Sequence, residues 1–92
     1  MARSKAVVAT SHGSRYLQQL CKHWSHKFTV DFTPQQGKID LGEGRTVALR
    51  ADDAALTVEV DAADLPRMQQ VVEDHIVRFA FRETLSFDWT PA

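Results

Sequence analysis

The stretch that decides the fold lies between Phe28 and Val60 and reads FTVDFTPQQGKIDLGEGRTVALRADDAALTVEV. Hydrophobic and polar residues alternate in four runs, which are separated by polar or Gly-containing turns at 33–37, 42–44 and 52–54. Alternation with a period of two residues is typical of a strand with one buried and one solvated face. Because such clean alternation favours antiparallel pairing, this stretch predicts a four-stranded antiparallel meander.

A further strand and two helices flank the meander. Residues 5–10 are apolar and rich in β-branched side chains, which predicts a buried strand. Apolar residues spaced at 3.6 per turn predict helices over about 11–27 and 64–83. Ser11 and Asp64 are the expected N-cap residues, because their side-chain oxygens can accept a bond from an unpaired backbone N–H.

The expected element order is β-α-β-β-β-β-α, followed by a short strand or packed tail over 85–89. Each helix needs an apolar surface to cover, and each strand of the meander offers one apolar face. We therefore expect an α+β two-layer sandwich, one domain over residues 1–92, with both helices on one face of a mainly antiparallel sheet. The opposite face is expected to be polar, with Thr29, Asp31, Lys38, Asp40, Thr46, Arg50, Thr57 and Glu59.

The composition restricts the class of protein. Ninety-two residues, of which 43% are hydrophobic and 25% charged, describe one small soluble globular domain. No apolar run approaches the roughly 18–20 residues of a membrane span, so no membrane association is expected. The single cysteine, Cys21, cannot form an internal disulfide, and a reducing cytoplasm is the expected compartment.

The formal net charge of −1 conceals a segregation of charge along the chain. Residues 1–30 contain five basic residues and no acidic one, whereas residues 31–64 contain eight acidic and three basic residues. Such segregation can steer an anionic partner toward a basic surface. Nucleic acid is not expected to bind, because the open sheet face carries acidic side chains that would repel a phosphate backbone.

The first helix carries a polar line beside its apolar stripe, made of His12, Tyr16, Gln19, His23 and His26. The second helix offers a matching flank with His75, Arg78, Phe79 and Arg82. Three interpretations compete: a metal site of His23, His26 and His75; an anion pocket in which Lys22, Arg78 and Arg82 join the histidines; and a structural hydrogen-bond network. The structural network is favoured, because partly buried polar groups usually satisfy one another.

Enzymatic chemistry finds little support in the sequence. Cys21 lies on the apolar stripe of the first helix, which favours a small buried hydrophobic residue over a nucleophile. Neither a G-x-S-x-G elbow nor a Gly-rich phosphate loop is present. No catalytic residue and no resident cofactor is therefore assigned.

Two blocks of the sequence resemble a known family. Residues 15–27, RYLQQLCKHWSHK, and residues 75–83, HIVRFAFRE, together with Trp89, are similar to the bacterial domain of unknown function DUF2218. The resemblance implies an α+β fold similar to the TATA-binding-protein-like or phosphohexomutase C-terminal arrangement. It also implies an accessory role in iron or siderophore handling, with a siderophore-interacting reductase as a partner, and no established activity.

The sequence thus predicts a small, cytoplasmic, non-enzymatic binding or accessory module. Its two helices are expected to form a basic rim that meets an anionic small molecule or a protein partner. The candidate residues of this rim are Arg15, Tyr16, Lys22, His23, His26, His75, Arg78 and Arg82. The alternative is an interaction scaffold, such as a homodimer joined through its sheet edge or open face, with no small-molecule ligand.

Overall fold

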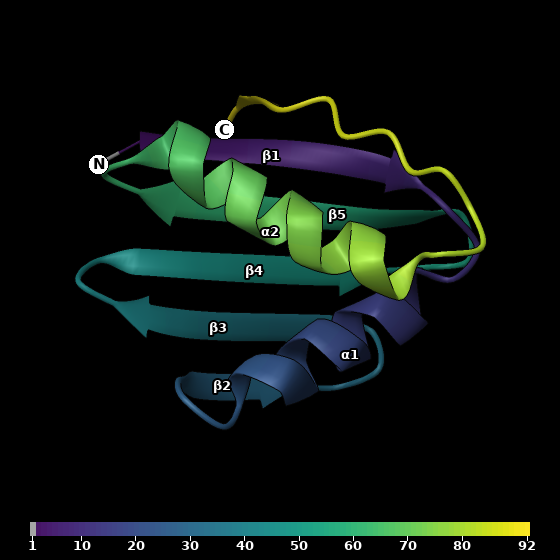
Figure 1. The fold of residues 1–92 in the computed structure, drawn as a ribbon, viewed down its shortest axis with the longest axis horizontal. Coiled ribbons are helices and arrows are strands. Elements are labelled where there is room, and N and C mark those ends of the chain that lie inside the picture. Colours follow the sequence, from purple (N-terminus) through teal and green to yellow (C-terminus); the bar gives the residue numbers. More distant parts are fainter. Residues whose placement is uncertain (1) are drawn as a thin grey trace.

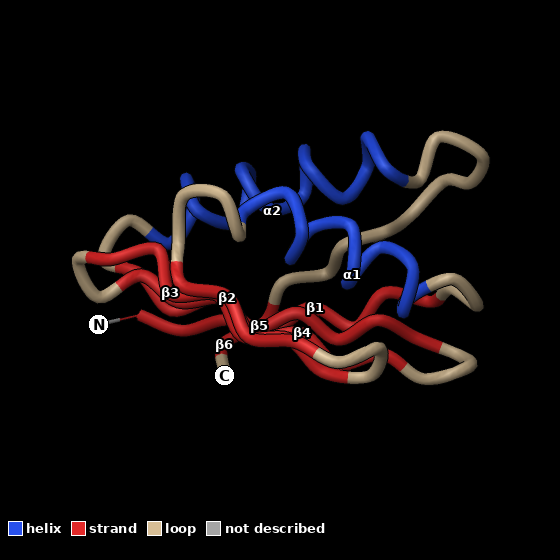
Figure 2. The backbone as a smooth tube through the Cα atoms, turned by 90° about the horizontal axis from the view of Figure 1, so that it is seen from below, coloured by secondary structure: helices blue, strands red, loops and turns tan. Residues whose placement is uncertain are grey.

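A computed structural model describes residues 2–92 and consists of one six-stranded antiparallel sheet with two helices on the same face (Figures 1 and 2). The strands are β1 (Ala2–Ala9), β2 (Thr29–Phe32), β3 (Gln36–Gly42), β4 (Arg45–Ala51), β5 (Ala55–Ala62) and β6 (Thr90–Pro91). The helices are α1 (Gly13–Trp24) and α2 (Leu65–Phe79). The predicted α+β fold and its element order are confirmed.

The strands lie in the order β2-β3-β4-β5-β1-β6. The meander pairs β2 through β5 in succession, as the alternation predicted. The first strand then inserts beside β5, with Ala2 opposite Ala62 and Ala9 opposite Ala55. In the turn between β3 and β4, Gly42 and Gly44 have φ values of +82° and +77°, a region that glycine enters without steric cost.

The core lies between the sheet and the helices. Alternate strand residues turn one face inward, and their largest fully buried side chains are Val8, Ile39, Val47, Leu56, Val58 and Val60. From α1, Leu17, Leu20 and Cys21 cover the β2-to-β5 side, while Val72 and Ile76 of α2 cover β5 and β1. Burial of these apolar side chains is the main favourable term that holds the two layers together.

Several element boundaries differ from the sequence-based expectation. The first helix begins at Gly13 rather than at Ser11, and it ends at Trp24. Ser11 is therefore not the N-cap; instead, the Thr10 hydroxyl accepts the backbone N–H of His12 at 3.0 Å. Asp64 does occupy the N-cap position of α2, without a side-chain capping bond.

The C-terminal segment is mostly a packed tail. The second helix ends at Phe79 instead of about residue 83, and the next residue, Ala80, is buried and has the non-helical angles φ −95° and ψ 43°. Leu85, Phe87 and Trp89 are partly buried against the core, and the indole N–H of Trp89 donates to a carboxylate oxygen of Glu73 on α2. Strand pairing is confined to β6, which lies beside β1.

Within residues 2–92, neither helix has the length and apolar character needed to cross a membrane.

Gly37 gives a test of how tightly α1 packs on β3. A Cβ atom at Gly37 would lie 2.7 Å from the Sγ atom of Cys21 and 3.3 Å from a methyl group of Leu17. We expect Gly37→Ala to lower the free energy of unfolding by about 1–3 kcal/mol, because overpacking outweighs the reduced entropy of the unfolded chain. Urea denaturation of the variant measures this loss.

Removing the sulfur atom should relieve the clash. We expect the double variant Gly37→Ala/Cys21→Ala to be more stable than the sum of the two single changes predicts, since neighbouring residues couple. Additivity of the two changes to within about 0.5 kcal/mol would show that the contact between β3 and α1 is not tight.

Candidate functional site

One carboxylate joins three segments of the chain where α2 ends and α1 begins. Glu83 accepts hydrogen bonds from the hydroxyl of Tyr16, on α1, and from the hydroxyl of Thr10, which follows β1, at 3.1 Å. The Nδ1 atom of His12 lies 3.1 Å from the same carboxylate. Tyr16 and Thr10 are buried, whereas the Glu83 side chain is 28% exposed. The network therefore forms the floor of an opening rather than a closed core.

The ionisation states of Tyr16 and Glu83 follow from this contact. Burial raises the pKa of Tyr16 to about 12, and the hydrogen bond to Glu83 and its negative charge add to the rise. The hydrogen bond from Tyr16 in turn lowers the pKa of Glu83, with further contributions from His12 and Thr10. At neutral pH the Tyr16 hydroxyl therefore stays protonated and donates a hydrogen bond to the ionised carboxylate of Glu83.

A cavity of about 400 Å³ opens above this network, and we refer to it as the α1–α2 pocket. It is lined by His12, Arg15, Tyr16, Phe79, Phe81, Arg82 and Glu83. Phe81 is 77% exposed, and the guanidinium carbon of Arg82 lies 5.3 Å from its ring centre. In the described residues 2–92, neither Arg15 nor Arg82 forms an ion pair with a carboxylate. The pocket thus presents two unpaired cations beside an exposed aromatic ring.

A second cluster lies farther along the same two helices. The ring centre of His75 lies 5.3 Å from that of His23 and 5.1 Å from that of Trp24. The Nδ1 atom of His75 lies 2.7 Å from the carbonyl oxygen of Val71. Phe79 connects this cluster to the α1–α2 pocket, since its ring also lies edge-on to His23 at 6.3 Å.

The structure brings five of the eight candidate residues into these two clusters. Arg15, Tyr16 and Arg82 line the α1–α2 pocket, and His23 and His75 are adjacent. The hydroxyl of Tyr16 donates its hydrogen bond to Glu83, so Tyr16 contributes to the pocket by holding that carboxylate in place.

The other three candidates, Lys22, His26 and Arg78, are exposed and form no side-chain hydrogen bond or ion pair among residues 2–92. His26 lies beyond α1, which ends at Trp24 and not at about residue 27, so that within the helix the polar line consists of Tyr16, Gln19 and His23. Consistent with this, the described part of the chain contains no group of three His, Cys, Asp or Glu residues placed to hold one metal ion. The described residues thus do not bring His23, His26 and His75 together as three ligands of one ion, and which ligand the candidate residues bind stays a prediction.

The structural-network interpretation fits part of the site. It describes the bonds of Tyr16 and His12 to Glu83, but Arg82 pairs with no acid in the described residues. Sequence reasoning gave no role to Thr10 and left Glu83 and Phe81 out of the candidate set. The position of Glu83, an acidic residue directly after Arg78 and Arg82, was the only feature of the sequence that could have indicated its role. The residues that it contacts lie 67 to 73 positions away in sequence, and no local pattern predicts such contacts.

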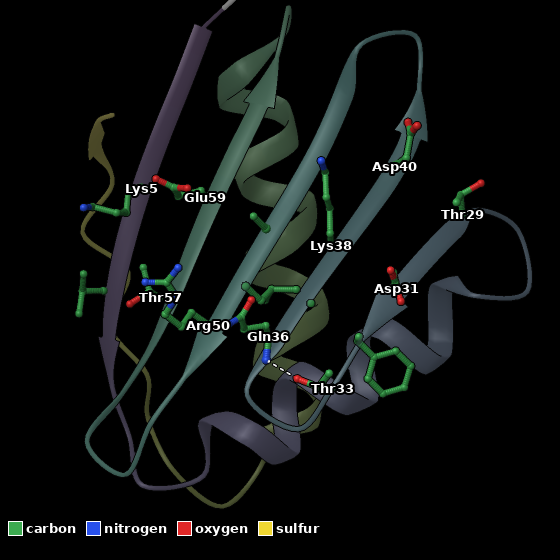
Figure 3. A pocket seen from close by; sticks show the side chains of 15 residues that line it. Lys5, Thr29, Asp31, Thr33, Gln36, Lys38, Asp40, Arg50, Thr57 and Glu59 are labelled. Carbon is green, nitrogen blue, oxygen red and sulfur yellow. Dashed lines mark hydrogen bonds between the residues drawn. The ribbon is translucent and has the colours of Figure 1, made fainter.

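The opposite face of the sheet is open and forms a broad hollow of about 820 Å³ (Figure 3). Ten of its fifteen lining residues are polar, and they carry charges of both signs. Lys5 stands opposite Glu59 across β1 and β5, and Asp31 stands opposite Lys38 across β2 and β3. These neighbouring opposite charges leave no concentrated potential of one sign on this face.

Comparison with known proteins identifies the chain's relatives. A family model described as an uncharacterized protein conserved in bacteria, DUF2218, matches residues 5–90. The NMR structure of PA4090 from Pseudomonas aeruginosa is 41% identical in sequence, with a TM-score of 0.81. The match covers 100% of this chain and 98% of that chain. No curated protein matches this chain.

The Glu83 network predicts a specific dependence of stability on pH. Because folding lowers the pKa of Glu83, its ionised form stabilises the fold above the ordinary glutamate pKa of about 4.3, and this contribution is lost as the pH falls through the lowered value. We expect Glu83→Gln to lower the urea midpoint at pH 7 and to flatten its fall below about pH 4.5. Urea denaturation between pH 3 and pH 7 measures both effects.

Tyr16→Phe should weaken the same acid dependence, since the Tyr16 hydroxyl is the main cause of the lowered Glu83 pKa. Glu43→Gln, in the exposed turn between β3 and β4, is the matched control and should leave the pH profile unchanged. Identical profiles for Glu83→Gln and Glu43→Gln would refute the assigned role of Glu83.

Cys21 should behave as an inert thiol. It is completely buried, and burial raises its pKa to about 11, which lowers the thiolate fraction at pH 8 about a hundredfold relative to an ordinary cysteine. We expect a disulfide reagent to label the native protein at least about a hundredfold more slowly than the urea-unfolded protein. Labelling at the unfolded rate would instead show an exposed, reactive thiol.

Proposed function

The chain belongs to DUF2218, a family of uncharacterised proteins conserved in bacteria, and from this premise we propose that it binds an anionic ligand in the α1–α2 pocket. The observation that carries the proposal is that the guanidinium groups of Arg15 and Arg82 line one opening and that neither forms an ion pair within residues 2–92. Guanidinium groups form strong, charge-assisted hydrogen bonds to carboxylates and phosphates. A small carboxylate or phosphate is the class of ligand that this arrangement favours.

The negative charge of Glu83 would repel an anion in the pocket, but the hydrogen bonds that its carboxylate accepts reduce this repulsion. Three groups, from Tyr16, Thr10 and His12, contact the carboxylate and offset part of its charge. The two guanidinium groups outnumber the single carboxylate, so the net charge of the pocket lining stays positive with His12 neutral. Glu83 thereby holds the start of α1 against the segment after α2, and it does not cancel the positive charge of Arg15 and Arg82.

Phe81 adds an apolar surface to the pocket. Phe81 is largely exposed, and its ring lies against the Arg82 guanidinium, a geometry in which the ring face attracts a cation. An exposed aromatic side chain beside charged groups favours a ligand with both an apolar and an anionic part. The acidic surface of a protein partner would present the same combination.

The finer form of this proposal is the accessory role in iron or siderophore handling that the family resemblance implies. The anionic ligand would then be a siderophore-related carboxylate, and the protein partner a siderophore-interacting reductase. We also propose a cytoplasmic location, which the free and buried thiol of Cys21 supports, because thiols remain reduced there.

Ligand-dependent thermal stabilisation tests the proposal. Citrate, inorganic phosphate and ferric citrate are the probes, each compared with NaCl at equal ionic strength, because a ligand that binds the native state raises its apparent stability. We expect Arg15→Gln and Arg82→Gln each to weaken the binding of the stabilising probe about tenfold or more, since hydrogen bonds to charged groups contribute about 1.5–3 kcal/mol. Melting temperatures over a concentration series of each probe give the affinities.

Arg67→Gln is the matched control, because Arg67 is an exposed arginine in the first turn of α2, away from the pocket. It should bind the probes as the unaltered protein does. Equal affinities in Arg82→Gln and Arg67→Gln would refute the site. Concentration-dependent association in sedimentation, with no stabilisation by any probe, would instead favour a homodimer through the sheet edge or the open face.

A further inference from the structure

The imidazole ring of His75 is held in one orientation by its own helix. Its Nδ1 atom lies 2.7 Å from the carbonyl oxygen of Val71, and a carbonyl oxygen can only accept a hydrogen bond. The Nδ1 atom therefore carries the hydrogen, and in the neutral ring the Nε2 atom keeps a free lone pair. Histidines that bind metals are commonly oriented in this way, with the second nitrogen bonded to a carbonyl or carboxylate oxygen.

A second imidazole from the neighbouring helix stands beside this ring. The ring centres of His23 and His75 lie 5.3 Å apart, with their planes tilted by 52°. Two imidazole nitrogens that each lie about 2.0–2.1 Å from one tetrahedral metal ion hold their ring centres roughly 5 Å apart. The observed separation of the two ring centres matches this spacing.

We propose that His23 and His75 together bind a divalent transition metal ion, such as Zn²⁺, Ni²⁺ or Cu²⁺, between α1 and α2. Imidazole nitrogen is a preferred ligand of these ions. In the described residues no third His, Cys, Asp or Glu completes a larger metal cluster. Water or a small anion fills the remaining coordination positions, because His23 is exposed to solvent.

The surroundings of His23 and His75 are compatible with the positive charge of a bound metal ion. The nearby cations Lys22 and Arg78 are exposed, so that solvent screens their repulsion of a bound ion. Trp24 and Phe79 pack against the two imidazole rings and restrict their movement. This site uses neither Arg15 nor Arg82, so the proposal of a metal site does not depend on the proposal of an anion pocket.

Quenching of tryptophan fluorescence tests the proposal, because the ring centre of Trp24, one of the chain's two tryptophans, lies 5.1 Å from that of His75. Protein without a histidine tag is titrated with Cu²⁺ or Ni²⁺, whose unfilled d shells quench a neighbouring indole. We expect saturable quenching, and we expect His23→Gln and His75→Gln each to weaken it about tenfold or more, since even the loss of a supporting group around a metal costs about that much. Zn²⁺ should raise the melting temperature of the unaltered protein and not that of either variant.

His26→Gln, at an exposed position, is the matched control and should quench like the unaltered protein. Unsaturable quenching, undiminished quenching in His23→Gln, or equal weakening in His26→Gln would overturn the proposal. Because His23 is exposed, His23→Gln keeps the test valid even where His75→Gln fails to fold. We expect His23→Gln still to bind the anion probe that stabilises the unaltered protein, which would show that the metal site and the anion pocket are distinct.

Discussion

The contact of Glu83 with Tyr16, Thr10 and His12 is the constraint on which the site depends. It joins the segment after α2 to the start of α1 and to the end of β1, three parts of the chain that only the folded state brings together. Figure 1 shows the C-terminal end of α2 lying next to the beginning of α1, where this contact forms. A buried tyrosine hydroxyl needs a partner, and a carboxylate is a strong acceptor for it.

This contact also determines what the seam between the helices presents to solvent. By drawing the chain back toward α1 after Ala80, it leaves Phe81 and Arg82 exposed beside Arg15. Farther along, the approach of α2 to α1 places His75 against His23 and Trp24. The same helix packing thus creates a basic pocket near the start of α1 and an imidazole pair near its C-terminal end.

The sequence predicted the fold well because its signals are local. The alternation from Phe28 to Val60 and the apolar stripe through Leu17 and Leu20 each report which face of one element is buried. It predicted the ends of the helices less well. Thr10, not Ser11, bonds to a backbone N–H just before α1, and α2 stops at Phe79, after which Ala80 and the tail pack against the core.

For the candidate site, the sequence determined which chemical groups the two helices carry and on which face each lies. A helical period of 3.6 residues fixes that much within a single element. Only the tertiary structure decided that Arg15 shares a pocket with Arg82, that His23 meets His75, and that His26 meets neither. The crossing and register of two helices are decided by side-chain packing between residues about fifty or more positions apart, and no pattern within either helix records that packing.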